Sequence, residues 1–93
     1  MTPLRKQMLQ DMQLAGLADN TQSAYIQAVL RFSRHYQGLA PQNATEKHLV
    51  EYLIHLQHTV AEGTFKTNRY GLTFLFANTL QREWPLFQKK SEA

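Results

Sequence analysis

The chain contains four stretches in which apolar residues recur with the period of an α-helix, and short breaks separate them. No stretch shows the alternation of apolar and polar residues that marks a β-strand. The first helix is expected to start at Thr2–Pro3, a capping residue followed by a proline suited to the first helical position, and to end near Gly16. The pattern predicts a compact all-α domain built from four helices.

The second and third helices are bounded by residues that favour helix ends. Three adjacent residues could cap the second helix: Asp19, Asn20 and Thr21. This helix is expected to reach Gly38, and Pro41 then breaks the loop of residues 38–44. Thr45 is a natural cap for the third helix, with Glu46 in its first turn, where the helix dipole favours an acid.

The fourth helix is expected to begin at a short turn, Glu62–Thr64, and to reach about Leu80. Trp84–Pro85 is expected to end the helical pattern. Arg69 falls on the apolar side of this helix, where its stem could pack on the core while the guanidinium reaches water or an acid. The apolar residues cover most of the helix, which predicts a buried helix: Phe65, Leu72, Phe74, Leu75, Phe76 and Leu80.

Each of the other helices has one apolar face, and these faces supply the rest of the expected core. In the first helix the face consists of Leu4, Met8 and Met12. In the second it consists of Tyr25, Ile26, Val29, Leu30, Phe32 and Tyr36. In the third it consists of Leu49, Val50, Leu53, Ile54, Leu56 and Val60.

Composition narrows the functional classes. A chain of 93 residues has room for one small core and little room for a deep substrate cleft. Without cysteine it can form neither disulfides nor thiolate zinc sites, and a reducing, cytoplasmic compartment is expected. No apolar run is long enough for a membrane span, and residues 1–10 do not resemble a signal peptide. The net charge of +3 permits a polyanionic partner without requiring one.

Three histidines and an acid form a stripe on the third helix, on the side away from its leucines: His48, Glu51, His55 and His58. Imidazoles and a carboxylate are suitable zinc ligands, but a structural site needs four ligands in a closed shell. A solvated polar face is therefore the favoured interpretation, and no metal or cofactor is expected. His35 lies near the end of the second helix, where a cation suits the dipole.

The motifs of nucleophilic catalysis and phosphate binding are absent from the sequence. It contains no G-x-S-x-G elbow, and its glycines are isolated at positions 16, 38, 63 and 71. The carboxylates are few and scattered. We expect no enzymatic activity in this chain.

Two polar stripes are more informative. On the second helix the stripe is Ser23, Gln27, Arg31 and Arg34, and on the fourth it is Thr64, Lys66, Thr67, Asn68 and Arg69. No acid interrupts either stripe. Hydroxyls, amides and cations are the groups that contact phosphates and base edges, and a helix N-terminus adds backbone amides. The pattern is compatible with a DNA-binding surface, but on its own it favours an ordinary solvated surface, which commonly has the same composition.

The order of residues also resembles a known family. Asn20–Tyr25 followed by Leu30–Phe32 is similar to the start of the second helix in tyrosine recombinases, the phage-type integrases. Thr64–Phe65, Gly71–Phe76 and Thr79–Pro85 resemble the fourth helix of that family and the exit toward its catalytic domain. The resemblance extends from about residue 4 to residue 85.

This resemblance implies a SAM-like, four-helix orthogonal bundle that binds the core of a recombination half-site. It implies a DNA-binding domain over residues 1–85, with residues 86–93 as a polar tail that begins a linker to a catalytic domain beyond this chain. The implied DNA-binding residues are Thr21, Gln22, Ser23, Gln27, Arg31, Thr64, Lys66, Thr67, Asn68 and Arg69.

The resemblance also implies the partners. Double-stranded DNA would be bound by this domain, and neighbouring recombinase protomers would be contacted in the full-length protein. The chain alone is expected to be monomeric and to have no membrane partner. The alternative is a helical protein-interaction or oligomerisation module, which predicts self-association and indifference to DNA.

Overall fold

The computed structural model describes residues 3–88, and within that range the chain is all-helical, as predicted. The four longer helices are α1 (Pro3–Leu14), α2 (Asp19–His35), α3 (Glu46–Thr59) and α4 (Glu62–Thr73). The short elements are the 3₁₀ turn η1 (Pro41–Asn43), the π-helical segment η2 (Phe74–Thr79) and α5 (Pro85–Gln88). None of the helices in residues 3–88 is long and apolar enough to cross a membrane.

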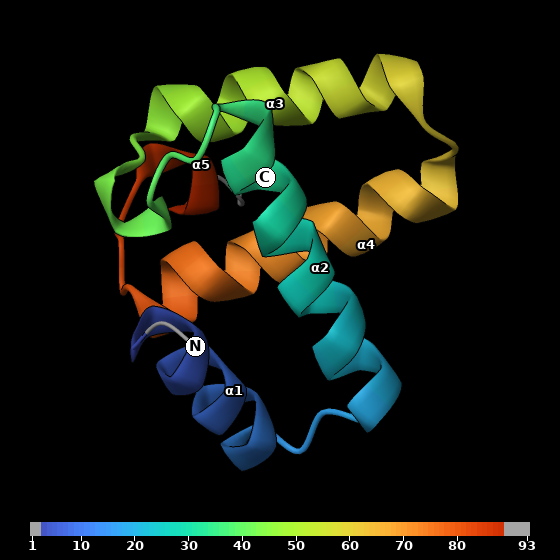
Figure 1. The fold of residues 1–93 in the computed structure, drawn as a ribbon. Coiled ribbons are helices and arrows are strands. Elements are labelled where there is room, and N and C mark those ends of the chain that lie inside the picture. The colour runs from blue at the N-terminus through green and yellow to red at the C-terminus, as the bar shows by residue number, and fades with distance from the viewer. Residues whose placement is uncertain (1–2, 89–93) are drawn as a thin grey trace.

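The helices pack around α4. Figure 1 shows α3 and α4 as an antiparallel pair joined by a short turn, with α2 crossing over α4. The interface between α2 and α4 is the most extensive in the bundle, and α1 lies against η2 and α2. The crossing gives α2 and the N-terminal turns of α4 a shared surface, and the candidate site described below lies on it.

The core consists mainly of the predicted apolar faces. Its buried members include Met8, Met12, Ile26, Phe32, Leu49, Tyr52, Leu56, Leu72, Leu75 and Phe76. The Phe32 ring lies in edge-to-face contact with Tyr52 and Phe76, at centroid distances of 5.2 and 5.7 Å. The predicted apolar face of α3 differs from the structure at two residues. Ile54, which was included in that face, is 52% exposed, and Tyr52, which was left out of it, is buried.

The predicted cap of α3 is confirmed. Thr45 Oγ1 accepts a hydrogen bond from the backbone N–H of His48, and His48 Nδ1 accepts one from the N–H of Thr45. This reciprocal pair is a capping box in which histidine takes the position usually held by Glu or Gln. Thr2, the predicted cap of α1, lies outside the described residues.

The helix α2 begins within the predicted segment of residues 19–21, but its predicted cap and its predicted C-terminal end were wrong. Ala18 occupies its N-cap position without a side-chain hydrogen bond, and Asp19 is already helical. The helix ends at His35 rather than Gly38, because Gln37 and Gly38 adopt positive φ angles of 60° and 90°. The N–H of Gly38 then donates to Ser33 O, which satisfies one of the last helical carbonyls.

The C-terminal part of the chain differs from the expectation in two ways. The fourth helix widens into η2, in which the N–H of Leu80 donates to the carbonyl five residues back, on Leu75. Pro85 does not end the helical pattern but opens α5, since proline suits a first helical position. Glu46 Oε2 accepts the backbone N–H of Leu86 at 2.8 Å, which ties α5 to the start of α3.

Residues 86 and 87 are therefore not part of a polar tail. Leu86 and Phe87 are half-buried and pack against the core, with the Phe87 ring stacked on Trp84 at 5.8 Å. The remainder of the predicted tail, residues 89–93, lies outside the described residues.

Candidate functional site

A groove between α2 and α4 brings together five of the predicted binding residues. We call it the α2–α4 groove, and its volume is about 370 Å³. Its lining from α2 is Ala24, Gln27, Ala28 and Arg31, and its lining from α4 is Gly63, Thr64, Thr67 and Asn68. The lining contains no acid, so the groove presents amide, hydroxyl and guanidinium groups from two helices to one ligand.

The rim and the floor of the groove differ in exposure. Gln27, Arg31 and Thr64 are exposed at the rim. Thr67 is half-buried, and its hydroxyl donates to Gly63 O at 3.1 Å, so the oxygen can still accept a hydrogen bond. The groove therefore has one cationic group, and the other polar groups around it are neutral.

Asn68 forms the floor and is only 3% exposed. Its Nδ2 donates to the carbonyl of Thr64 at 2.8 Å, whereas its Oδ1 is buried without a partner. The sequence-based interpretation placed Asn68 on an exposed polar stripe and Arg69 toward the core. The structure reverses them: Asn68 is buried and Arg69 is exposed.

A smaller hollow continues from the groove toward the N-terminus of α2. It contains Thr21, Asn20 and Tyr25 on one side and Thr67 and Tyr70 on the other, and it shares Ala24 and Thr67 with the groove. Thr21 therefore belongs to the same face of the bundle as the groove.

Two predicted residues of α2 lie on another side of that helix. Gln22 and Ser23 line a hollow with Arg5 of α1. The Gln22 amide donates to Leu17 O at 2.8 Å, so it fastens the connection between α1 and α2. Gln27 lines both this hollow and the α2–α4 groove and joins the two surfaces.

Lys66 and Arg69 of α4 are exposed but are not part of the groove lining. Lys66 Nζ lies 3.5 Å from the carboxylate of Glu62, and the Arg69 guanidinium lies 5.3 Å from the centre of the Tyr70 ring. The interpretation of the first turns of the fourth helix as acid-free was wrong, because α4 begins at Glu62.

The small residues of the groove were missed by sequence reasoning. Ala24 and Ala28 are four positions apart on α2, and Gly63 faces them from the start of α4. Short side chains at these positions leave the space that the longer polar residues surround. The regular spacing of Ala24 and Ala28 was the available signal.

The histidine stripe of α3 divides between two roles. His48 is half-buried in the capping box, whereas His55 is exposed and packs on His35 with ring centroids 4.9 Å apart. Within residues 3–88, no group of three His, Asp or Glu side chains converges in a way that could hold a metal ion.

A buried tyrosine, Tyr52, and a half-buried one, Tyr36, lie beside this cluster. Burial raises the pKa of Tyr52, and the nearby positive charge of Arg31 partly offsets that rise. Burial also raises the pKa of Tyr36, with a further increase from the negative charge of Glu51. Arg31 therefore acts electrostatically on the core side of α2 as well as lining the groove.

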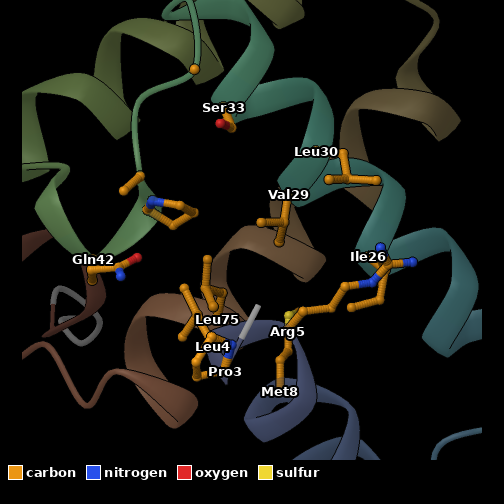
Figure 2. Close-up of a pocket in the computed structure, with 13 residues that line it drawn as sticks. Pro3, Leu4, Arg5, Met8, Ile26, Val29, Leu30, Ser33, Gln42 and Leu75 are labelled. Atoms are coloured by element: carbon orange, nitrogen blue, oxygen red, sulfur yellow. The ribbon is translucent and has the colours of Figure 1, made fainter. Parts of the chain in front are cut away.

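A separate hollow of about 610 Å³ lies between α1, α2 and the loop before α3. Figure 2 shows Leu4 and Met8 of α1, Val29 of α2 and Leu75 of η2 converging on it. Its walls are mainly apolar, and Arg5 contributes a cation at its edge. This hollow lacks the convergent polar groups that distinguish the α2–α4 groove.

Comparison with known proteins identifies the family. Residues 4–86 match the family model described as phage integrase, N-terminal SAM-like domain. The chain belongs to this family. The family resemblance and the all-α SAM-like fold predicted from the sequence are thereby confirmed.

A curated relative supports the assignment. This SAM-like domain is 35% identical over 86 residues to the protein named "Putative integrase/recombinase y4qK" from Sinorhizobium fredii (strain NBRC 101917 / NGR234). The alignment covers 90% of this chain and 28% of the relative, so the chain spans less than a third of that protein's length. No solved structure matches the chain.

Proposed function

We propose that this SAM-like domain binds double-stranded DNA through the surface formed by α2 and the first turns of α4, as the non-catalytic part of a site-specific recombinase. The observation that carries the proposal is the α2–α4 groove, where Gln27 and Arg31 of one helix meet Thr64 and Thr67 of another without an acid in the lining. These are the side chains that contact phosphates and base edges in protein–DNA complexes.

The charge distribution accounts for the expected strength of binding. Arg31 is the cation in the groove, and Lys66 and Arg69 lie on the same helix as its α4 wall. Three cations neutralise few phosphates, so affinity should be low and should fall with salt by about 0.9 log units per log unit of salt for each phosphate contacted. In the full-length recombinase, a second DNA-binding domain on the same site would raise the effective affinity.

Chemical-shift mapping tests the proposal directly. The ¹⁵N-labelled chain is titrated with a mixed-sequence duplex of about 20 base pairs at about 50 mM salt, where screening of surface charges is weak. Shifts are expected at Thr21, Gln27, Arg31, Thr64 and Thr67. An absence of shifts, or shifts confined to the outer face of α3, would contradict the proposal.

A matched pair of variants distinguishes the effect on DNA binding of a charge in the groove from the effect of a charge elsewhere on the surface. Arg31→Ala should weaken duplex binding and reduce the salt slope by about one, as expected for one lost phosphate contact. Lys47→Ala removes an exposed cation of α3, outside the groove lining, and should leave both quantities unchanged. Equal effects of the two variants would indicate a non-specific response to net charge.

The alternative, a protein-interaction module, has weaker support. Leu14 and Ile54 are 81% and 52% exposed, but they lie on separate helices, α1 and α3. Single exposed apolar side chains are common on monomeric proteins. Sedimentation at increasing protein concentration distinguishes the two functions. A DNA-binding domain should remain monomeric in the absence of DNA, whereas an oligomerisation module should self-associate.

A further inference from the structure

Among the buried residues of the range 3–87, Asn68 is the one with an amide or charged side chain, and half of its amide group is unpaired. The hydrogen bond from Nδ2 to Thr64 O fixes the orientation of the amide, because only the nitrogen can donate to a carbonyl. Oδ1 must then point away from Thr64, and it has no hydrogen-bond partner. Buried amide oxygens are usually paired, so this atom requires an explanation.

The unpaired oxygen belongs to a residue that lines the α2–α4 groove. Gln27 and Arg31 flank that groove with long, exposed side chains, which change rotamer rapidly and can move aside for a ligand. An amide oxygen only accepts hydrogen bonds. A ligand that pairs with it must therefore bring a donor, which the oxygens of a phosphodiester cannot do.

We propose that Asn68 is a specificity-determining residue whose Oδ1 accepts a hydrogen bond from the exocyclic amino group of adenine or cytosine. This inference rests on the proposed function of the domain. In the major groove, adenine N6 and cytosine N4 are donors, whereas guanine and thymine present acceptors and a methyl group. Asn68 therefore favours an amino-bearing base at one position of one strand.

The surrounding side chains complete this assignment. Arg31 and the hydroxyl of Thr64 stand at the rim, where they suit the phosphates next to the selected base. Asn68 lies at the floor below these rim residues, and a base edge that extends into the groove would approach it there. Affinity and selectivity are thus assigned to different residues of one groove, and they can be separated by experiment.

The experiment begins with duplexes selected from a randomised library by the 93-residue chain at low salt. In the selected duplex, each adenine is replaced in turn by purine, which lacks the 6-amino group, and each cytosine by 2-pyrimidinone, which lacks the 4-amino group. One replacement should weaken binding about five- to tenfold, close to the value of a single hydrogen bond, and its identity tells whether the base is adenine or cytosine.

The variant Asn68→Leu, which keeps the size of the side chain without its polar atoms, should bind the original and the replaced duplex equally well. Circular dichroism establishes whether this variant is folded. The base replacements on the unaltered chain remain decisive if it is not.

The outcomes separate this inference from the function on which it rests. Binding by the unaltered chain that tolerates every amino-group deletion overturns the role of Asn68 and leaves the DNA-binding function intact. A uniform loss of affinity in Asn68→Leu, with the response to amino deletion retained, also overturns it and assigns Asn68 to structure alone. A chain that selects no duplex overturns both the proposed function and this inference.

Discussion

Gly71 of α4 lies directly against the backbone of Tyr25 in α2. A Cβ atom placed on Gly71 would be 3.0 Å from the Tyr25 Cα and 3.2 Å from its Cβ. The closest of these atoms is backbone, which cannot move aside as the end of a flexible side chain can. The absence of a side chain at Gly71 therefore sets how closely the two helices of the proposed binding surface approach.

Gly71→Ala is expected to destabilise the domain by about 1–3 kcal/mol, the usual cost of overpacking a close contact. For a domain of this size, each kcal/mol corresponds to a decrease in melting temperature of about 4–8 °C. Gly63→Ala is the matched control, because a Cβ there meets nothing within 4 Å, and it should be neutral or slightly stabilising. Similar melting temperatures for the two variants would contradict the close approach of the helices.

Loss of the capping box of α3 should also be measurable. Thr45→Ala removes the oxygen that accepts the His48 N–H and should lower the free energy of unfolding by about 1 kcal/mol. Lys47→Ala, two residues further along on the exposed surface, should change it by less than about 0.5 kcal/mol. Urea denaturation of both variants checks this, and an unaffected Thr45→Ala would show that the cap contributes nothing.

The parts of the fold that depend on the spacing of apolar residues could be predicted from the sequence. Apolar spacing located all four longer helices, and Thr45 marked the start of α3 correctly because its cap depends on local residues. The start of α2 could not be chosen among three capping-type residues, since Ala18 became the cap without a side-chain bond. The π-helical geometry of η2 and the docking of α5 depend on contacts distant in sequence, such as Glu46 with Leu86.

The sequence predicted several of the residues that form the candidate site, but it did not predict the orientation of all of their side chains. Helical spacing selected Gln27 and Arg31, and the structure places both in the α2–α4 groove. Spacing alone gave the wrong orientation for Asn68 and Arg69, because a one-residue shift on a helix rotates a side chain by about 100°. The pairing of Lys66 with Glu62 was missed, because the helix begins two residues earlier than the first polar residue of the stripe.

Stability should decrease at high pH because of the buried Tyr52 and the half-buried Tyr36. The pKa values of Tyr36 and Tyr52 are raised in the folded state, so above the unfolded value of about 10 the folded chain holds more protons than the unfolded chain. The contribution of these two protonated hydroxyls to the free energy of unfolding is fully present below about pH 10. It is lost as the pH rises through the folded-state pKa values.

Tyr52→Phe removes one of these two titrating groups, so the decrease in the free energy of unfolding above pH 10 should be shallower than in the unaltered chain. Denaturation curves between neutral pH and about pH 11 measure the slope, with each protein's value at pH 7 as its own reference. A slope unchanged by the substitution would assign the alkaline loss to other groups.

The ion pair between Glu62 and Lys66 leads to a final prediction, on DNA affinity. Both side chains are exposed, at 53% for Lys66 and 82% for Glu62, so the pair contributes little to folding. Its carboxylate nevertheless places a negative charge in the first turn of α4, next to the groove residue Gly63. Glu62→Gln should therefore increase affinity for duplex DNA about two- to fivefold at low salt, with a smaller gain at high salt, because screening weakens the repulsion of phosphates.

The same substitution at Glu51, an exposed acid of α3 outside the groove, changes the net charge equally and serves as the control. Fluorescence anisotropy with a labelled duplex at two salt concentrations measures both variants. If Glu51→Gln gives the same gain as Glu62→Gln, net charge explains the effect. A gain restricted to Glu62→Gln locates the phosphates near the N-terminus of α4, beside the groove residues Thr64 and Thr67.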